Sequence, residues 1–385
     1  MTDGAGSNAL QPGALLGVLG GGQLGRMFAL AARRMGYRVA VYSPEENSPT
    51  GVIADREFIA PYEDLAQVEA FAREVDVVTF EFENVPSATA EAAARHAPVR
   101  PDGALLHTTQ NRRREKEALR GLGLPVADFA CIESESDLAA ARENVPFPAV
   151  LKTAAWGYDG KGQRKVETAA DLPAAWRELD RTPSVLETWV TFEREVSVIG
   201  ARSVTGEIAL YRPLENEHVD HILDLTMWPA RLEESSEKKA LEVAHAVFDG
   251  LDVVGVLCVE MFVRSDGEVL VNELAPRPHN SGHLTIDAHE TSQFEQQVRA
   301  ICGLPLGSVA PLQPAAAMAN LLGHAWEKRT PDWGTVLSEP GVKLHLYGKT
   351  EPRLLRKMGH LNATGATLEA AVERVQRARS RLLGN

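Results

Sequence analysis

A glycine-rich loop near the N-terminus limits the first part of the chain to a parallel α/β fold. The apolar run over 14–19 meets Gly-Gly-Gly-Gln-Leu-Gly at 20–25, and we predict a helix over 27–34 and a strand over 38–42 after it. This order is a β–loop–α–β unit, which belongs to parallel sheets covered by helices. Another helix and a strand that ends at Phe82 come next. The first hundred residues are therefore predicted to form a small parallel α/β domain.

The length of the chain, 385 residues, requires more than one hydrophobic core, because single cores stop growing at about 250 to 300 residues. After Phe147-Pro148 a strand is predicted over 149–153, and a second glycine-rich loop follows it. A long helix over 237–248 and a C-terminal helix from Thr367 are also predicted. We therefore expect two or three domains.

The charge and the cysteines exclude several classes of protein. Forty Lys and Arg face fifty-three Asp and Glu, a net charge of −13, which repels polyanions and argues against nucleic acid as a partner. The three cysteines lie too far apart for a disulfide framework or a metal cluster, which fits a reducing compartment. We find neither a signal peptide nor an apolar run of about 18 residues. A cytoplasmic protein without a membrane partner is expected.

The first glycine loop suits a phosphate, since glycine lets the backbone approach an anion at a helix N-terminus. A nicotinamide cofactor would also need an acidic residue where the second strand ends, but that strand ends at Tyr42-Ser43-Pro44 and Glu45 comes only after the proline. We favour a phosphate-binding loop for another ligand. A tight turn with a purely structural role is the alternative.

The second glycine loop, 157–163, follows the strand that carries Lys152. A Walker loop would need Ser or Thr after Lys161 and then a helix, whereas Gly162 and the predicted strand 163–166 follow. We therefore predict a hairpin flap whose amides close over nucleotide phosphates while Lys152 supplies a fixed charge. An exposed hairpin without a ligand is the alternative.

A predicted hairpin of strands 253–263 and 268–274 carries two acidic side chains, Glu260 and Glu273. One register of the turn places them diagonally and the neighbouring register places them directly opposite, so they share a face roughly 5 to 8 Å apart. Two buried carboxylates repel each other unless a cation lies between them, and oxygen ligands favour Mg²⁺ that bridges to phosphates. We predict one or two Mg²⁺ ions here; an exposed ladder without a metal is the alternative.

Two further segments carry candidate ligands. Arg277, His279 and Asn280 follow Glu273 closely and could surround a planar anion, with Arg277 binding it through two hydrogen bonds. The strand edge 187–190 could pair with an adenine, with Glu195 near the ribose. A basic group near the C-terminus could hold a second phosphate; its members are Lys349, Arg353, Arg356 and Lys357.

The order of these pieces resembles that of the ATP-grasp ligases. The strings GGGQLGRM, TFEFENVP, QNRRREK, GYDGKGQ, FEREVSVI, NELAPRPHNSGH and RKMGHLN are similar to those of the 5-(carboxyamino)imidazole ribonucleotide synthases, over about residues 14 to 362. This resemblance implies an α/β (α+β) ATP-grasp fold. Its expected parts are a disordered extension over 1–13, a Rossmann-like pre-ATP-grasp domain over 14–110, an ATP-grasp domain over 111–305 with a flap subdomain at about 120–190, and a small β-rich domain over 306–385.

The resemblance also assigns residues. The residues implied in ATP binding are Arg112, Lys152, Gly157, Tyr158, Asp159, Gly160, Lys161, Gly162, Gln163, Glu187, Thr188, Trp189, Val190, Glu195, His218, Asn272 and Glu273. Those implied in binding aminoimidazole ribonucleotide are Gln23, Leu24, Glu81, Tyr158, Asp159, Lys161, Lys349, Arg356 and Lys357. Lys161 stands where some members have Arg. Glu260 and Glu273 would hold Mg²⁺, and the catalytic residues would be Lys152, Arg277, His279 and Asn280.

The activity that the resemblance implies is an ATP-dependent carboxylation of aminoimidazole ribonucleotide by bicarbonate through carboxyphosphate, in purine synthesis, by a homodimer. Two alternatives stay open. One is another ATP-grasp ligase, such as a formate-dependent transformylase or a carboxylase of another amine. The other is a nucleotide-binding regulator without catalysis.

Overall fold

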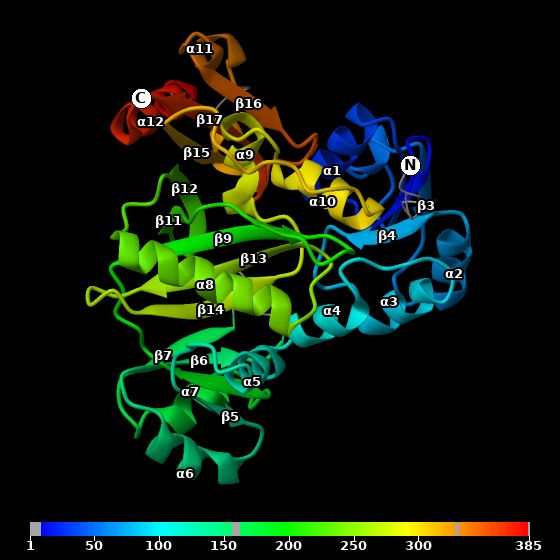
Figure 1. Cartoon of the computed structure of the whole chain (residues 1–385). Coiled ribbons are helices and arrows are strands. Elements are labelled where there is room, and N and C mark those ends of the chain that lie inside the picture. The colour runs from blue at the N-terminus through cyan, green and yellow to red at the C-terminus, as the bar shows by residue number, and fades with distance from the viewer. Residues whose placement is uncertain (1–8, 156–161, 328–330, 384–385) are drawn as a thin grey trace, which may run out of the picture.

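The computed structural model describes residues 9–155, 162–327 and 331–383, and the strands in these ranges form three sheets (Figure 1). The helices are α1 (Gln23–Arg34), α2 (Leu65–Arg73), α3 (Ser87–Ala94), α4 (Gly103–Thr109), α5 (Arg112–Gly121), α6 (Glu135–Asn144), α7 (Leu172–Glu178), α8 (Glu234–Gly250), α9 (Thr285–Ala288), α10 (Gln293–Cys302), α11 (Trp333–Leu337) and α12 (Leu368–Leu383), with 3-10 turns η1 (Gly51–Ile53), η2 (Asn280–Leu284) and η3 (Gly323–Trp326).

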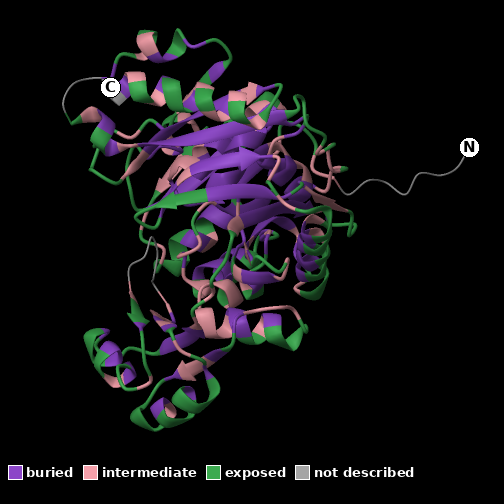
Figure 2. Ribbon diagram, turned by 90° about the vertical axis from the view of Figure 1, so that its left-hand side faces the viewer, coloured by how far each residue is buried: buried purple, intermediate pink, exposed green. Residues whose placement is uncertain are grey.

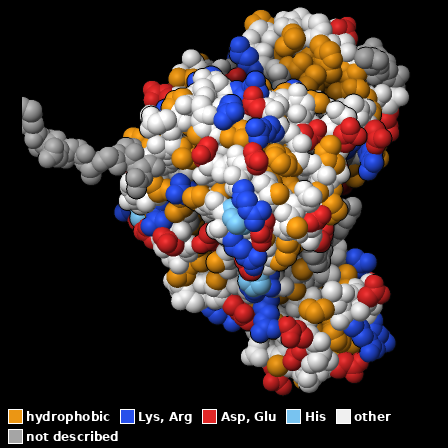
Figure 3. Space-filling view, turned by 90° about the vertical axis from the view of Figure 1, so that its right-hand side faces the viewer, with side chains coloured by type: hydrophobic (Ala, Val, Ile, Leu, Met, Phe, Trp, Pro, Cys, Tyr) orange, Lys and Arg blue, Asp and Glu red, His pale blue; other side chains and the backbone are white. Residues whose placement is uncertain are grey.

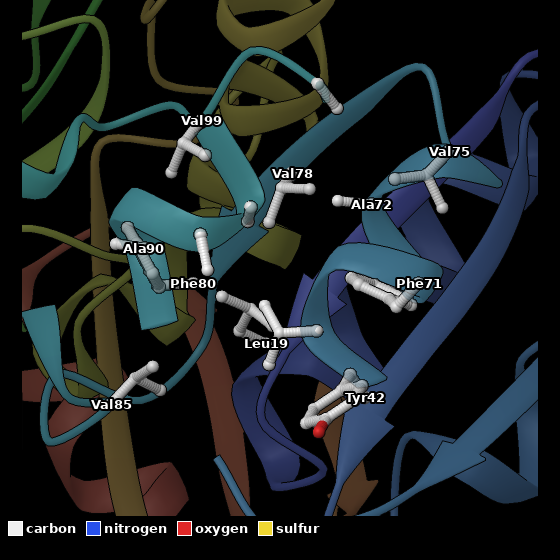
Figure 4. Packing of buried hydrophobic residues seen from close by; sticks show 14 of the residues in the cluster. Leu19, Tyr42, Phe71, Ala72, Val75, Val78, Phe80, Val85, Ala90 and Val99 are labelled. Carbon is white, nitrogen blue, oxygen red and sulfur yellow. The ribbon is translucent and has the colours of Figure 1, made fainter. Parts of the chain in front are cut away.

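The first sheet is parallel, with the strand order β3-β2-β1-β4. Its strands are β1 (Leu15–Leu19), β2 (Arg38–Ser43), β3 (Arg56–Ile59) and β4 (Val77–Phe80). One face packs against α2 and α3, where Leu19, Tyr42 and Phe71 share a core (Figure 4). The other face packs against α1 and α10 through residues such as Phe28 and Phe294. The parallel α/β arrangement predicted from the glycine loop is confirmed.

The second sheet has nine strands in the order β14-β13-β9-β11-β12-β15-β17-β16, with β10 beside β9. Its strands are β9 (Arg194–Arg202), β10 (Ile208–Leu210), β11 (Leu214–Val219), β12 (Ile222–Trp228), β13 (Gly255–Val263), β14 (Val269–Ala275), β15 (Ala315–Leu322), β16 (Val342–Leu346) and β17 (Lys357–Gly365). Much of this sheet is buried (Figure 2), with α8 and α12 packed on it. The predicted C-terminal β-rich region is present, and its strands join the central sheet because β15 pairs with β12.

The third sheet lies below the central one in Figure 1 and has the order β5-β8-β6-β7. Its strands are β5 (Phe129–Ile132), β6 (Ala149–Thr153), β7 (Gln163–Val166) and β8 (Ser184–Thr188). Helices α6 and α7 cover it through a core of their own. The antiparallel pair β6–β7 is the hairpin that the second glycine loop predicts.

The ordered part of the chain begins earlier in the structure than the sequence predicted. We expected residues 1–13 to lack fixed structure, but the amide of Leu10 donates to the Cys302 carbonyl at 2.9 Å and the Tyr37 hydroxyl donates to the Leu10 carbonyl at 2.7 Å. The prediction is therefore wrong for residues 9–13, because Leu10 packs against the core between the first sheet and α10 and its backbone is hydrogen-bonded there. Residues 1–8 lie outside the described residues. None of the helices in the described part of the chain combines the length and apolar composition needed to cross a membrane.

Candidate active site

The paired carboxylates of the predicted hairpin face each other directly. Glu260 of β13 is the partner of Glu273 of β14, whereas the next pair is Met261 with Val271, so Asn272 is an extra residue in a β-bulge. Burial works to raise the pKa of Glu260, but His279 and other cations lower it to about 2. Burial, and then the charge of Glu260, raise the pKa of Glu273. Of the two registers left open, the structure has the directly opposed one.

His279 and Asn280 bind protein groups in this structure. The Nε2 of His279 lies 3.0 Å from a carboxylate oxygen of Glu260, and its Nδ1 lies 2.8 Å from the Ser281 hydroxyl. Asn280 exchanges two hydrogen bonds with Asn320 of β15, at 3.1 and 2.9 Å. We expected both side chains to complete an anion site. In the structure His279 contacts one of the paired carboxylates and Asn280 connects η2 to the C-terminal strands, so their part in an anion site stays a prediction.

Arg277 is also engaged. Its Nη2 donates to a carboxylate oxygen of Glu83 at 2.6 Å, its Nε donates to the other oxygen, and its Nη1 donates to the Pro278 carbonyl at 3.1 Å. Burial acts to lower the pKa of Arg277, but Glu83 raises it above its ordinary value. The guanidinium that we predict to bind a planar anion through two hydrogen bonds thus binds an internal carboxylate in this way.

The first glycine loop does not bind an external phosphate through the amides that we expected. The amides of Gly22 and Gly25 donate to the two carboxylate oxygens of Glu81, at 2.7 and 3.3 Å. A Cβ on Gly20, which has φ +114°, would lie 2.5 Å from the Glu81 side chain. The prediction of a phosphate at this helix N-terminus is corrected for a physical reason: the amides attract an anion, and the carboxylate that follows β4 supplies it.

The other residues of this loop lie where the α1 helix starts. Leu24 is largely buried in the core beneath the first sheet, whereas Gln23 is half-buried. Arg26 donates to the Pro49 carbonyl and lies beside Gly348 of the C-terminal region. The loop thus meets the C-terminal region, far away in the sequence.

The predicted basic group gathers at this junction. Lys349 donates to the Lys357 carbonyl at 2.9 Å. Burial lowers the pKa of Lys349 to about 8, with a further lowering by Arg356 and an opposing effect of Glu81. Arg353 instead pairs with Glu351 at 3.0 Å and is largely exposed. Although the chain is acidic overall, Figure 3 shows that Lys and Arg side chains gather locally on its surface.

Lys152 and Glu187, both predicted to contact ATP, meet in the third sheet. The carboxylate of Glu187 lies 3.3 Å from Lys152 Nζ and 3.2 Å from Lys116 Nζ, and all three side chains are largely buried. Burial works to raise the pKa of Glu187, but the two lysines lower it to about 2. Burial lowers the pKa of Lys152 and Glu187 opposes this effect. Glu187 therefore positions Lys152.

Part of the strand edge 187–190, which we predicted to pair with adenine, makes backbone hydrogen bonds within the protein. The amide of Thr188 donates to the Asp128 carbonyl and that of Trp189 to the Pro148 carbonyl, both at 2.9 Å. These two amides are engaged within the protein, so the adenine pairing stays a prediction for the remaining amides and carbonyls of the edge 187–190. Trp189 is 44% exposed and Val190 is half-buried.

Three other predicted ATP contacts lie near the paired carboxylates. Glu195 of β9 and His218 of β11 form an ion pair at 2.5 Å. Burial acts to lower the pKa of His218, but Glu195 raises it, with a contribution from Glu260. Arg112, at the start of α5, lies close enough to lower the pKa of Glu273. The structure therefore brings these residues close to the paired carboxylates of the β13–β14 hairpin.

The flap is described only at its base. Gly157, Tyr158, Asp159, Gly160 and Lys161 lie outside the described residues. Gly162 has φ +71° and its carbonyl accepts from the Thr153 amide at 2.8 Å, and Gln163 pairs with Lys152. A Cβ on Gly162 would lie 2.6 Å from the Thr153 hydroxyl, so glycine suits this close contact.

Comparisons with known proteins place the chain in a family. Domain models match in order: the ribonucleotide synthetase preATP-grasp domain over 14–110, the ATP-grasp domain over 117–294 and the phosphoribosylaminoimidazole carboxylase C-terminal domain over 316–374. N5-carboxyaminoimidazole ribonucleotide synthase of Bacillus subtilis strain 168 is 45% identical over 91% of this chain and 92% of that protein. This chain belongs to the N5-carboxyaminoimidazole ribonucleotide synthase family.

Solved structures of synthases agree. The Staphylococcus aureus N5-carboxyaminoimidazole synthetase complexed with ADP is 33% identical, with a TM-score of 0.89 over 96% of this chain and 98% of that chain. The Aspergillus clavatus N5-carboxyaminoimidazole synthase in complex with ADP and 5-aminoimidazole ribonucleotide is 32% identical, with a TM-score of 0.87 over 97% of this chain and 100% of that chain. The ATP-grasp fold and the ligase class predicted from the sequence are confirmed.

Sequence reasoning missed several residues in this synthase site. They are Glu83, Glu115, Lys116 and Asn320, each of which binds a predicted site residue or the backbone beside one. Glu83 and Lys116 stand inside strings that carry the family resemblance, so a search of those strings for charged residues without a role would have found them. Asn320 stands in an apolar run, Ala315–Leu322, where a single amide is a signal of burial with a partner.

Proposed function

We propose that this chain uses ATP and bicarbonate to carboxylate 5-aminoimidazole ribonucleotide, giving N5-carboxyaminoimidazole ribonucleotide, ADP and phosphate. The observation that carries the proposal is the opposed pair Glu260 and Glu273 with Lys152 and Arg277 nearby, in a chain of the synthase family. The relatives support the ligands: one solved synthase holds ADP, and another holds ADP and aminoimidazole ribonucleotide.

Mg²⁺ fits the paired carboxylates. Their oxygens are hard ligands, and within the described residues no group of three or more His, Cys, Asp or Glu side chains could hold a metal alone. This suits Mg²⁺, which is commonly bound by one or two carboxylates together with substrate phosphates. One or two ions would be held by Glu260 and Glu273 and would neutralise phosphate charge. His279 keeps Glu260 ionised and oriented through its 3.0 Å contact.

The residues of the chain divide the remaining work. We propose that Lys152, held by Glu187, faces the ATP phosphates, with Arg112, Glu195, His218 and the flap 157–163 around the nucleotide. A phosphate of ATP would pass to bicarbonate, and the flap would exclude water, because carboxyphosphate is hydrolysed readily. Arg277 would bind bicarbonate once that anion replaces Glu83, with His279 and Asn280 beside it.

Aminoimidazole ribonucleotide is proposed to lie between the first glycine loop and the C-terminal basic group. The residues offered there are Gln23, Glu81, Lys349, Arg356 and Lys357, together with Tyr158, Asp159 and Lys161 of the flap. Because the loop amides are bound to Glu81, the substrate phosphate would be bound by the cations Lys349, Arg356 and Lys357, which are all half-buried. Glu81 would then meet the neutral part of the substrate.

We also propose a cytoplasmic homodimer, on the family resemblance and the cysteines. Light scattering of the purified chain tests the dimer. The two alternatives, another ATP-grasp ligase and a regulator without catalysis, are distinguished by phosphate release from ATP.

The test is phosphate release from ATP with each component omitted in turn. We expect turnover only when ATP, Mg²⁺, bicarbonate and aminoimidazole ribonucleotide are all present. Turnover with formate in place of bicarbonate, or with another amine, would instead indicate a different ATP-grasp ligase. ATP binding without turnover under every condition would indicate a regulator.

A further inference from the structure

Two consecutive residues of α5 hold the backbone of β14 on both sides of Asn272. Lys116 Nζ donates to the carbonyls of Asn272 and Val271, at 2.9 and 3.4 Å. The carboxyl group of Glu115 accepts from the amide of Leu274 at 3.1 Å. Lys116 is 2% exposed and Glu115 is 3% exposed. These contacts are directed at the strand that carries Glu273.

The extra residue of the bulge, Asn272, decides which way the side chain of Glu273 points. Val271 pairs with Met261 and Glu273 pairs with Glu260, so the bulge at Asn272 absorbs one residue. If Asn272 paired regularly with Glu260, without a bulge, Glu273 would oppose Val259, whose side chain lies in the core beneath α8. A shift of one residue moves a side chain to the other face of a sheet. The bulge is therefore required for the two carboxylates to meet.

The ammonium group of Lys116 is fully matched by its acceptors. It has three N–H donors, and it contacts two carbonyls and the carboxylate of Glu187, 3.2 Å away. A buried charge without such partners would cost several kcal/mol. Since Glu187 also pairs with Lys152, the same lysine connects the bulged strand to the strand that carries Lys152.

We infer that Lys116 and Glu115 are positioning residues that fix the β14 bulge, and with it the approach of Glu273 to Glu260. The inference rests on the proposed function, in which those two carboxylates hold Mg²⁺. A purely structural role would lower stability without changing the Mg²⁺ requirement. A positioning role changes the Mg²⁺ requirement more than the KM for aminoimidazole ribonucleotide, because the bulge lies at the metal carboxylates.

The test compares Lys116→Met with the exposed control Lys238→Met on α8, a residue that is 77% exposed. We expect Lys116→Met to raise the Mg²⁺ concentration for half-maximal activity by about 10- to 100-fold, the usual effect of removing a group that supports metal ligands. The KM for aminoimidazole ribonucleotide should change less than about threefold, and Lys238→Met should leave both unchanged. A folded Lys116→Met variant with the native Mg²⁺ requirement would overturn the inference.

A second variant covers the case in which Lys116→Met does not fold. Glu115→Gln keeps an acceptor for the Leu274 amide and Glu115→Leu removes it, so only the latter should speed hydrogen exchange of that amide in metal-free protein and raise the Mg²⁺ requirement. Unchanged exchange and Mg²⁺ requirement in Glu115→Leu would contradict the inference. If the unmodified chain shows no turnover, the proposed function fails, whereas the exchange measurement still tests the bulge.

Discussion

Arg277 and Glu83 form a two-point ion pair, with Arg277 Nη2 2.6 Å from a Glu83 oxygen. The pair joins the segment after β14 to the segment after β4, and it fills the guanidinium face proposed for bicarbonate. Bicarbonate must therefore compete with an internal carboxylate.

This competition predicts the effect of Glu83→Gln. The neutral amide should bind Arg277 less strongly, and since a hydrogen bond between charged groups contributes about 1.5 to 3 kcal/mol, the KM for bicarbonate should fall about tenfold. Glu74→Gln, at an exposed pair with Arg56, is the control. Steady-state kinetics with varied bicarbonate measure the effect, and an unchanged or higher KM would show that Glu83 does not compete.

Glu273→Gln should remove most Mg²⁺-dependent turnover, by about 100-fold or more, because it deletes the charge of one metal ligand at nearly constant volume. The metal-free protein should be no less stable, since the substitution removes the repulsion between Glu273 and Glu260. Glu268→Gln at a half-exposed position of the same hairpin, away from the paired carboxylates, serves as control. Full turnover of Glu273→Gln at saturating Mg²⁺ would rule out the proposed metal site.

The pH dependence of kcat/KM for aminoimidazole ribonucleotide should follow the ionisation of Lys349. Because burial lowers the pKa of this lysine to about 8, its charge is present below that pH and lost above it. The substrate phosphate is already fully ionised there, since its second pKa is about 6. We expect kcat/KM for aminoimidazole ribonucleotide to fall above about pH 8, and Lys349→Arg to remove this fall. A profile that is the same in both proteins would assign the titration elsewhere.

His289 should make the fold sensitive to acid. Burial lowers its pKa from 6.5 to about 4, so the unfolded chain binds a proton that the folded chain refuses. This contribution of His289 to the free energy of unfolding is complete above pH 6.5 and is lost as the pH falls through 4. At about 1.4 kcal/mol per pKa unit, the loss is about 3 kcal/mol. Urea unfolding at pH 7 and pH 4 measures it, with His289→Phe expected to weaken the dependence and His245→Gln, which is exposed, to keep it. Equal pH dependence in all three proteins would contradict this assignment.

The hairpin shows how far the sequence could predict the site. Alternation along the two strands and the turn residues were enough to place Glu260 and Glu273 on one face. They could not choose the register, because the bulge at Asn272 is held by Lys116 and Glu115, which lie more than 150 positions away in the sequence. In the α5 segment, Leu119 is the apolar residue one turn on from both of them and lies on the same buried face, but a single leucine among so many charged residues does not predict that Glu115 and Lys116 turn inward.

The first glycine loop shows another limit. The sequence correctly indicated that an anion lies at the start of α1, but the same amides can bind an external phosphate or an internal carboxylate. Only the tertiary structure, which brings Glu81 from the end of β4 to the loop, decides between them. The fold of this domain could be predicted more readily, because the order of its elements along the chain and their hydrophobic pattern indicate a parallel sheet that contains β1, β2 and β4.

The central claim is that ATP phosphorylates bicarbonate, and the route of the oxygen atoms tests it most directly. Bicarbonate labelled with ¹⁸O is mixed rapidly with the chain, ATP, Mg²⁺ and aminoimidazole ribonucleotide, before the label exchanges with water through CO₂. We predict that the inorganic phosphate carries one labelled oxygen per turnover, because the bridging oxygen of carboxyphosphate leaves with the phosphate. Unlabelled phosphate formed together with carboxylated product would contradict the account, since ATP would then have activated a different group.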